Sequence, residues 1–264
     1  MDTNEIKIIL LILLLSIGNC WAGCCAKSQC TLADQKQDGP VDMVLTKLSK
    51  RTKELQYYQA RVEYKFIQPL FESTTRRKGM MYYAKFADKS KLRVDFKTLK
   101  QDDEKEILFR EEFIFDGIWL TQINYQSKQV RKRQMAEPNK PVDAFELAGR
   151  NLPIIGFAKI EELKKQFEIN MVEQQGVEKA DLIHLHLKVK PDSMYKDNYT
   201  SVDFWIDKKL GLPAKITAVS TEEDIYKINL VNPIINKKID PNVFEFIVPD
   251  NFGKEVIPLK KTDN

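Results

Sequence analysis

The chain has 264 residues, of which 43% are hydrophobic and 30% are charged, and its formal net charge at pH 7 is +4. This composition excludes collagen-like, low-complexity and wholly disordered chains, and the charge is weak for a nucleic-acid-binding protein of this length. We therefore expect one compact domain with no nucleic-acid partner. The basic clusters at residues 76–78 and 131–133 are interpreted as solvated strand ends.

The N-terminal region is typical of an export signal. Residues 8–17 form an apolar run as long as the hydrophobic region of a signal peptide, and small residues follow it. We expect residues 1–23 to be a signal peptide and the polar residues 24–40 to be a tether to the folded domain. This organisation places the domain outside the cytoplasm.

The cysteines cluster in the same region, since all four lie within the first thirty residues. The folded domain therefore has no disulfide framework. Residues 21–24 resemble an imperfect bacterial lipobox, in which Cys24 would be lipidated and would anchor the chain to the outer membrane. Cleavage near Ala22 without lipidation is the alternative, and it would leave a soluble periplasmic protein. A third alternative is that the N-terminal apolar segment is not cleaved and itself anchors the chain.

Beyond the tether, apolar residues recur at helical spacing and predict an amphipathic helix that begins at Pro40 and ends near Glu54. From Tyr58 to Phe66 the pattern changes to strict alternation, which is typical of a strand with one apolar and one polar face. Similar patterns predict five more strands joined by short turns, and these turns favour antiparallel hairpins. The five are 78–86, 91–98, 106–115, 118–125 and 128–135.

Two helical intervals, 141–151 and 158–166, then interrupt the strand pattern. Six further strands are expected after them, at 167–172, 182–189, 201–207, 214–220, 224–231 and 244–248. About a dozen strands with one N-terminal helix and one helical insertion indicate an α+β fold on a large, curved antiparallel sheet. Such a sheet must bury its apolar face, either by closing into a barrel or by wrapping around the helices.

The apolar face of the expected strands is rich in aromatic side chains. Such a face suits an adaptable ligand pocket, and it suits an ordinary hydrophobic core equally well. The set contains Tyr58, Val62, Tyr64, Phe66, Met80, Tyr82, Leu92, Val94, Phe96, Phe109, Phe113, Phe115, Trp119, Ile183, Leu185, Leu187, Phe204, Ile206, Tyr226, Ile228 and Leu230.

Enzyme motifs are absent from the sequence, which contains no nucleophile elbow, phosphate-binding loop, dinucleotide fingerprint or paired Cys-x-x-Cys site. We expect a non-enzymatic protein without a cofactor. His184 and His186 share one face of a predicted strand and could begin a metal site, with Asp203, Asp207 or Glu173 as the third ligand. No spacing determines that third ligand, so two solvent-facing histidines without a metal are the favoured interpretation.

Several local patterns, in their order along the chain, resemble the outer-membrane lipoprotein-sorting (LolA/LolB-like) family over residues 41–258. They are residues 57–62, residues 115–120, residues 144–151, residues 204–207 with 212–213, and residues 240–249 before 256–257. The resemblance implies an unclosed half-barrel wrapped around an N-terminal helix and a helical lid. It also implies an apolar cavity for the acyl chains of a lipoprotein or another lipid, and it leaves residues 259–264 as a C-terminal tail.

With this resemblance, part of the aromatic set becomes a candidate cavity lining. The candidates are Tyr64, Phe66, Tyr82, Val94, Phe96, Phe113, Phe115, Trp119, Leu185 and Phe204. The insertion at 141–157 becomes the candidate lid, with Phe145, Leu147, Leu152, Ile155 and Phe157 as its apolar members. Carriers of the family latch the lid with an arginine, whereas the corresponding stretch here offers only Lys85, which has no bidentate fork. The resemblance therefore does not extend to the latch.

The family contains soluble carriers and anchored acceptors, and a lipidated Cys24 would favour the acceptor. Acceptors reach the membrane through an exposed apolar residue on a loop, for which Leu99 is the candidate here, with Leu70 and Phe71 as further ones. We expect a monomer that works with envelope transport proteins and meets a membrane surface. The alternative is a sensory or protein-interaction module of the cell envelope that uses the same half-barrel.

Overall fold

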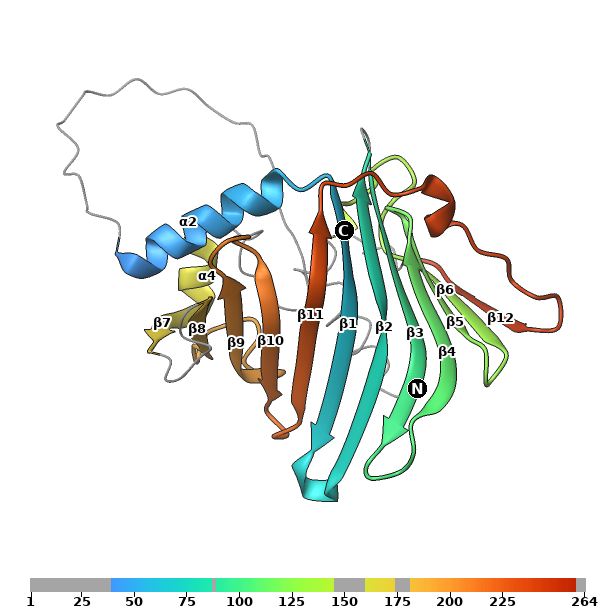
Figure 1. The fold of residues 1–264 in the computed structure, drawn as a ribbon, viewed down its shortest axis with the longest axis horizontal. Helices are drawn as coiled ribbons and strands as arrows, with labels where there is room; N and C mark the ends of the chain where they lie inside the picture. The colour runs from blue at the N-terminus through green and yellow to red at the C-terminus, as the bar shows by residue number, and fades with distance from the viewer. Residues whose placement is uncertain (1–38, 87–88, 145–159, 174–180, 260–264) are drawn as a thin grey trace.

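The computed structural model describes residues 39–86, 89–144, 160–173 and 181–259. Most of these residues belong to one sheet (Figure 1). Its strands are β1 (Tyr57–Gln68), β2 (Ser73–Lys85), β3 (Ser90–Gln101), β4 (Ile107–Phe115), β5 (Trp119–Asn124), β6 (Gln129–Gln134), β7 (Phe167–Val172), β8 (Leu182–Val189), β9 (Tyr199–Asp207), β10 (Pro213–Ser220), β11 (Ile225–Ile235) and β12 (Gly253–Ile257). The helices are α2 (Pro40–Lys53) and α4 (Ile160–Gln166), with short 3-10 turns η1 (Pro69–Phe71) and η3 (Pro241–Phe244).

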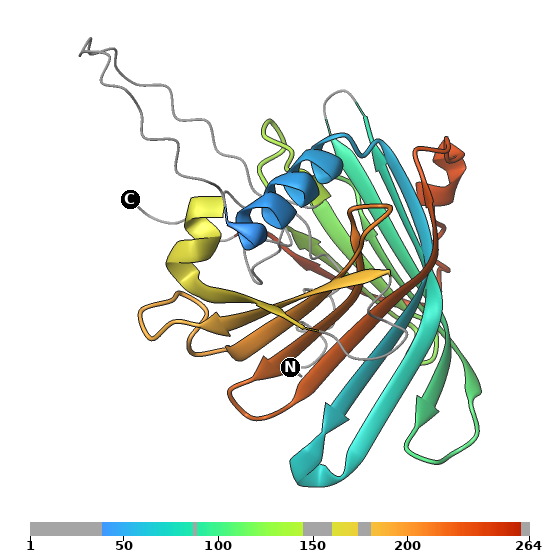
Figure 2. The ribbon, with the colours of Figure 1, turned by 60° about the vertical axis from the view of Figure 1, so that its left-hand side comes forward.

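The sheet is open and curved, as Figure 2 shows, and its strand order is β12-β6-β5-β4-β3-β2-β1-β11-β10-β9-β8-β7. Every pairing is antiparallel except that of β12 with β6, which is parallel. This arrangement confirms the α+β fold with a large, unclosed, mostly antiparallel sheet. It also confirms eleven of the twelve strands that the sequence predicts, with ends that differ by a few residues.

The predicted strand 244–248 is wrong. A 3-10 turn occupies Pro241–Phe244, and the Asp240 carboxylate caps its N-terminal end by accepting a hydrogen bond from the backbone N–H of Asn242. The residues that follow run over the sheet without joining it, and the last strand lies further on, at 253–257. Phe244 and Phe246 alternate with Glu245 as they would in a strand, but Phe244 packs onto the sheet whereas Phe246 is exposed.

Helix α2 forms where the sequence predicts it, with Pro40 in its first turn and the buried Leu45 and Leu48 on one side. It lies beside α4 across the open side of the curved sheet (Figure 2), and Lys164 of α4 forms an ion pair with Asp42 of α2 at 2.5 Å. Among the described residues, no helix combines the length and the apolarity that crossing a membrane requires.

The two faces of the sheet carry different clusters. The face toward α2, called the inner face here, holds the main core, which includes residues of both helices. The opposite outer face holds two smaller apolar clusters, one centred on Ala84, Ile239 and Phe244 and the other on Ile114, Ile123 and Val130. The C-terminal segment therefore covers part of the outer face, and the sheet is apolar on both sides there.

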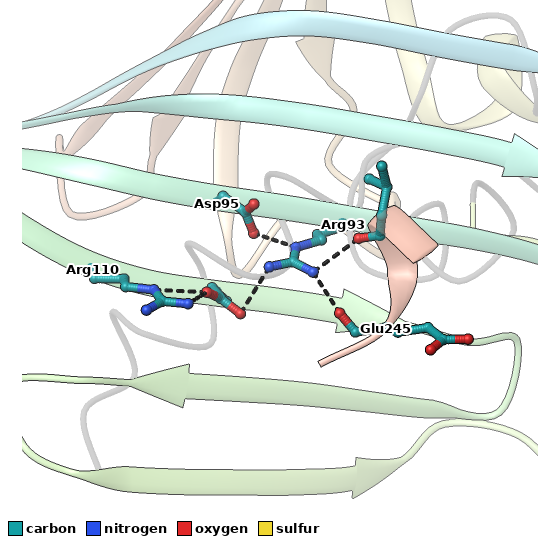
Figure 3. Close-up of polar contacts among 6 residues, drawn as sticks. Arg93, Asp95, Arg110 and Glu245 are labelled. Atoms are coloured by element: carbon teal, nitrogen blue, oxygen red, sulfur yellow. Dashed lines mark hydrogen bonds and ion pairs between the residues drawn. The ribbon is translucent and has the colours of Figure 1, made fainter. Parts of the chain in front are cut away.

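One arginine fastens this C-terminal segment to the outer face (Figure 3). The Nη1 atom of Arg93 donates hydrogen bonds to the carbonyl oxygens of Val243 and Glu245, both at 2.8 Å. Its Nε donates to Asp95 at 2.6 Å, and its Nη2 lies 3.1 Å from the buried Glu112 carboxylate. Burial raises the pKa of Asp95, although the Arg93 guanidinium opposes that shift. The five N–H donors of arginine suit a site with four acceptors.

Strands β2 and β3 approach closely at Gly79. A Cβ atom at this position would lie 1.9 Å from the backbone oxygen of Asp95 on β3. The register of the two strands shifts beside Gly79. A residue without a side chain is therefore required where the two strands meet.

Candidate ligand-binding site

Eight of the ten candidate lining residues lie together on the inner face. Each is at most 6% exposed, and all belong to the main core cluster. They are Tyr64, Phe66, Val94, Phe96, Phe113, Phe115, Leu185 and Phe204. Three of their rings pack in a row, with Phe96 against Tyr64 at a centroid distance of 6.4 Å and against Phe113 at 6.2 Å. The structure thus gathers these residues into one continuous apolar face.

The other two candidates lie on the outer face, contrary to the sequence interpretation. Tyr82 packs beside the outer cluster of Ile239 and Phe244, and the Lys132 ammonium lies 4.8 Å from the ring of Trp119. Their neighbours Tyr83 and Leu120 point inward instead. The prediction failed because consecutive apolar residues in these strands show no alternation from which the inward face could be identified.

The remaining candidates fall in different places. Leu99 is half-buried on the inner face, where it lies opposite Arg77. Leu70 and Phe71 are exposed on η1, at the tip of the β1–β2 hairpin. Two sets lie outside the described residues: Cys24 with the rest of the signal peptide and tether up to residue 38, and the lid residues Phe145, Leu147, Leu152, Ile155 and Phe157.

An apolar groove, called the α2 groove here, lies between helix α2 and strands β7 to β9. Its volume is about 270 Å³. The apolar residues that line it are Met43, Val44, Leu48, Met171, Ile183 and Ile206. Sequence reasoning missed this groove because its walls come from residues more than a hundred positions apart, and only the packing of α2 on the sheet brings them together.

A second depression, called the outer groove here, lies on the other side of the sheet and measures about 540 Å³. Its lining is strongly charged and includes Arg93, Asp95, Lys97, Arg110 and Glu112. Several of these charges already pair with one another, as Figure 3 shows for Arg93 and Asp95. Phe96, Leu108 and Phe109 also belong to the lining, so this groove suits a partner that offers both polar and apolar groups.

A buried ion pair interrupts the apolar inner face. The Nη1 atom of Arg77 on β2 lies 2.5 Å from the carboxylate of Glu111 on β4, which is fully buried. Gln122 of β5 donates to the same carboxylate at 3.0 Å, and the Arg77 guanidinium lies 5.1 Å from the centre of the Phe109 ring. Sequence reasoning treated Arg77 as part of a solvated cluster, although its position alternates with Gly79 and Met81 on the inward side of β2.

The two histidines do come together with one carboxylate. A ring nitrogen of His184 lies 2.7 Å from Oδ1 of Asp203, and one of His186 lies 2.9 Å from the same oxygen. The Trp205 ring stacks on His184 at 4.3 Å. Among the residues that the structure describes, no group of three or more His, Cys, Asp or Glu side chains is arranged to hold a metal ion. The Asp203 carboxylate therefore serves as the hydrogen-bonding partner of both rings.

Comparison with known proteins gives similarity at the level of structure only. No family model and no curated protein matches the sequence. Among solved structures, the chain is similar to an uncharacterized conserved protein from Thermus thermophilus, with 10% identity and a TM-score of 0.48 over 84% of this chain and 100% of that one. It is also similar to a LolA superfamily protein from Nitrosomonas europaea, with 9% identity and a TM-score of 0.32 over 77% and 96% of the two chains.

A third similar structure is the complex of MucA with MucB from Pseudomonas aeruginosa. Its identity to this chain is 12% and its TM-score is 0.41, over 77% of this chain and 60% of that one. The lipoprotein-sorting family that the sequence resembles is thus represented among the similar structures. At these identities the similarity concerns the fold alone, and a function has to be argued from the residues of this chain.

Proposed function

We propose that the chain is an exported, non-enzymatic protein that binds the acyl chains of lipoproteins or other lipids in the cell envelope. The observation that carries the proposal is the α2 groove. Two of its residues, Leu48 and Ile206, also belong to the main core, so the groove is continuous with the apolar inner face. Met43 and Met171 lie at the groove, and methionine side chains adapt well to hydrocarbon chains of varied shape.

The size of the groove suits part of an acyl chain. At about 270 Å³ it exceeds the ~150 Å³ of an engineered apolar cavity that binds benzene. Each methylene group that leaves water for such a surface contributes about 0.8 kcal/mol. Six buried methylenes would therefore provide about 5 kcal/mol, which supports capture with release rather than permanent retention.

Exposed residues at the β1–β2 hairpin support contact with a membrane surface. Leu70 and Phe71 point to solvent at the tip. On the outer face nearby, Lys65 lies directly between Arg76 and Lys227 on the neighbouring strands. Burial and these two cations lower the pKa of Lys65. Like charges placed opposite one another destabilise a sheet, and anionic lipid headgroups would relieve that repulsion. Cys24 would provide an anchor if it is lipidated.

Native mass spectrometry with lipid extraction tests the proposal on the full chain, produced with export to a bacterial periplasm. We expect acyl-bearing adducts on the wild type. The substitution Ile183→Trp fills the α2 groove and should remove the adducts, whereas Val256→Trp, on the exposed β12 at the other edge of the sheet, should keep them. A clean protein mass, together with failure to bind a fluorescent fatty acid, would refute lipid binding.

A specific observation also favours a second candidate function, a protein-interaction module of the envelope. The eight inward candidates are almost fully buried by one another, and the larger outer groove is lined by charged residues. Added bulk inside the sheet distinguishes the two functions. In a carrier, Val94→Trp or Leu185→Trp should displace bound lipid. In an interaction module, the same substitutions should only lower the melting temperature.

A further inference from the structure

The α2 groove has a basic end. Its lining includes Lys47 of α2 and Lys208, which directly follows β9. The ammonium group of Lys47 donates a hydrogen bond to the backbone oxygen of Lys208 at 2.9 Å, so the helix and the loop after β9 meet at this end. An ammonium group has three N–H donors, and within the described part of the chain Lys47 has no carboxylate partner. An anionic group can therefore bind at this end.

A glycine lets the Lys47 side chain lie in this place. Gly211, in the loop between β9 and β10, also lines the groove. A Cβ atom at residue 211 would lie 3.5 Å from Cε of Lys47 and 3.0 Å from Cγ of Arg51. The φ angle of Gly211 is +67°, in the left-handed region that favours glycine. The loop and the helix therefore pack closely, and the Lys47 side chain crosses the loop with its charge at the groove.

One carboxylate also lies at the basic end, and the loop already uses it. Asp207 lines the groove, and its Oδ1 atom accepts hydrogen bonds from the backbone N–H groups of Lys209 and Leu210, both at 2.8 Å. Such hydrogen bonds stabilise the charged form of a carboxylate. The described lining thus has two ammonium groups and one carboxylate that the loop stabilises, which favours an anionic ligand over a cationic one.

The opposite end of the groove is apolar and narrow. Met43 lies one helical turn before Lys47, and Met171 lies on β7 at the edge of the sheet. A cavity of ~150 Å³ binds the six carbons of benzene, so about 270 Å³ has room for roughly eleven carbons. Two chains side by side would have room for only about five carbons each. The groove therefore suits one chain with its head at Lys47.

We propose that the α2 groove binds a single-chain lipid with an anionic head, either a carboxylate or a phosphate. The charge lies at Lys47 and Lys208, and the chain runs along α2 toward Met171. The inference rests on the proposed lipid-binding function and names the class of lipid. Lysine is a point charge without a bidentate fork, so it accommodates both kinds of head.

Competition binding on the full chain tests the proposal with three lipids of equal chain length. Oleate carries a carboxylate, oleoyl lysophosphatidate a phosphate and monooleoylglycerol no charge, and each displaces the uncharged dye Nile red. We expect the wild type to prefer at least one anionic lipid over monooleoylglycerol by about fivefold at low salt, the upper range for one exposed ion pair. The anionic lipid that binds more tightly identifies the head. The preference should disappear at about 1 M salt, where the Debye length is ~3 Å.

Three variants locate the charge. Lys47→Met keeps the apolar stem and should abolish the preference, whereas Lys47→Arg keeps the charge and should retain it. Lys50→Met is the matched control, since Lys50 is also exposed on α2 but does not line the groove, and it should behave as the wild type. Melting temperatures of all three should stay close to that of the wild type, because residues 47 and 50 are exposed.

The outcomes separate this inference from the proposed function. Equal binding of charged and uncharged lipids by the wild type, or a preference that Lys47→Met retains, would overturn the inference and leave lipid binding standing. Loss of the preference in Lys47→Arg as well as in Lys47→Met would also overturn it, because the effect would then come from packing rather than charge. Binding of none of the three lipids would overturn both the inference and the lipid-binding function.

Discussion

The substitution Arg93→Met tests whether one guanidinium holds the C-terminal segment on the outer face. The Arg93 side chain is only 13% exposed, and it bonds to two carboxylates and two backbone carbonyls. Methionine fills a similar volume without a charge, so the substitution leaves the buried Glu112 without one of its two arginine partners. Breaking a buried ion pair from one side costs about 3–5 kcal/mol. We expect a loss in that range in the free energy of unfolding, measured by urea titration.

The matched control is Arg110→Met. Arg110 bonds to the same Glu112 carboxylate, at 2.8 and 2.9 Å, but its side chain is 61% exposed. Exposed ion pairs contribute about 0–1 kcal/mol, so this loss should be about 1 kcal/mol or less. Limited proteolysis should also cut residues 245–252 faster in Arg93→Met only. Equal losses in the two variants, or a loss below about 1 kcal/mol for Arg93→Met, would refute the reasoning.

Two further predictions concern alkaline pH and the β2–β3 contact. Burial raises the pKa values of Tyr58, Tyr64 and Tyr199 above their ordinary value near 10. Their stabilising contribution is therefore complete below pH 10 and falls as pH rises further, by about 1.4 kcal/mol per pH unit for each tyrosine. Tyrosinate absorbance should appear together with unfolding, and ionisation ahead of unfolding would contradict this account. Gly79→Ala should destabilise the fold by about 3 kcal/mol or more, because its Cβ would meet backbone at 1.9 Å. Gly39→Ala has open space around its Cβ and should cost only about 0.5–1 kcal/mol, because Gly39 is the N-cap of α2, where alanine is less favourable than glycine. Similar urea midpoints for the two variants would count against the stated contact.

The sequence predicts the strands well because a two-residue period is visible in each segment separately. It fails where both faces of a strand are apolar. Tyr82 and Trp119 have apolar neighbours at adjacent positions, so the pattern does not tell which of them points inward. It fails again at the C-terminus, where β12 forms by parallel pairing with β6, more than a hundred residues away. Nothing in the sequence near residue 253 indicates that partner.

The candidate site was also predicted only in part. Sequence reasoning identified most of the aromatic residues of the inner face, and it treated Arg77 as solvated because its neighbours at 76 and 78 are also basic. The α2 groove was missed, since Met43 and Met171 become neighbours only when α2 packs on the sheet.

The sequence by itself determined the local elements of this protein: the amphipathic helix, eleven strands and one apolar face. Hydrophobic periodicity is a local property, and short turns impose antiparallel pairing on consecutive strands. Only the tertiary structure decided which charges are buried. Arg77 and Glu111 are 34 residues apart and lie on strands separated by β3, so their pairing depends on the register of three strands at once. Burial of a charge is tolerated only with such a partner, and the partner exists only after the sheet has formed.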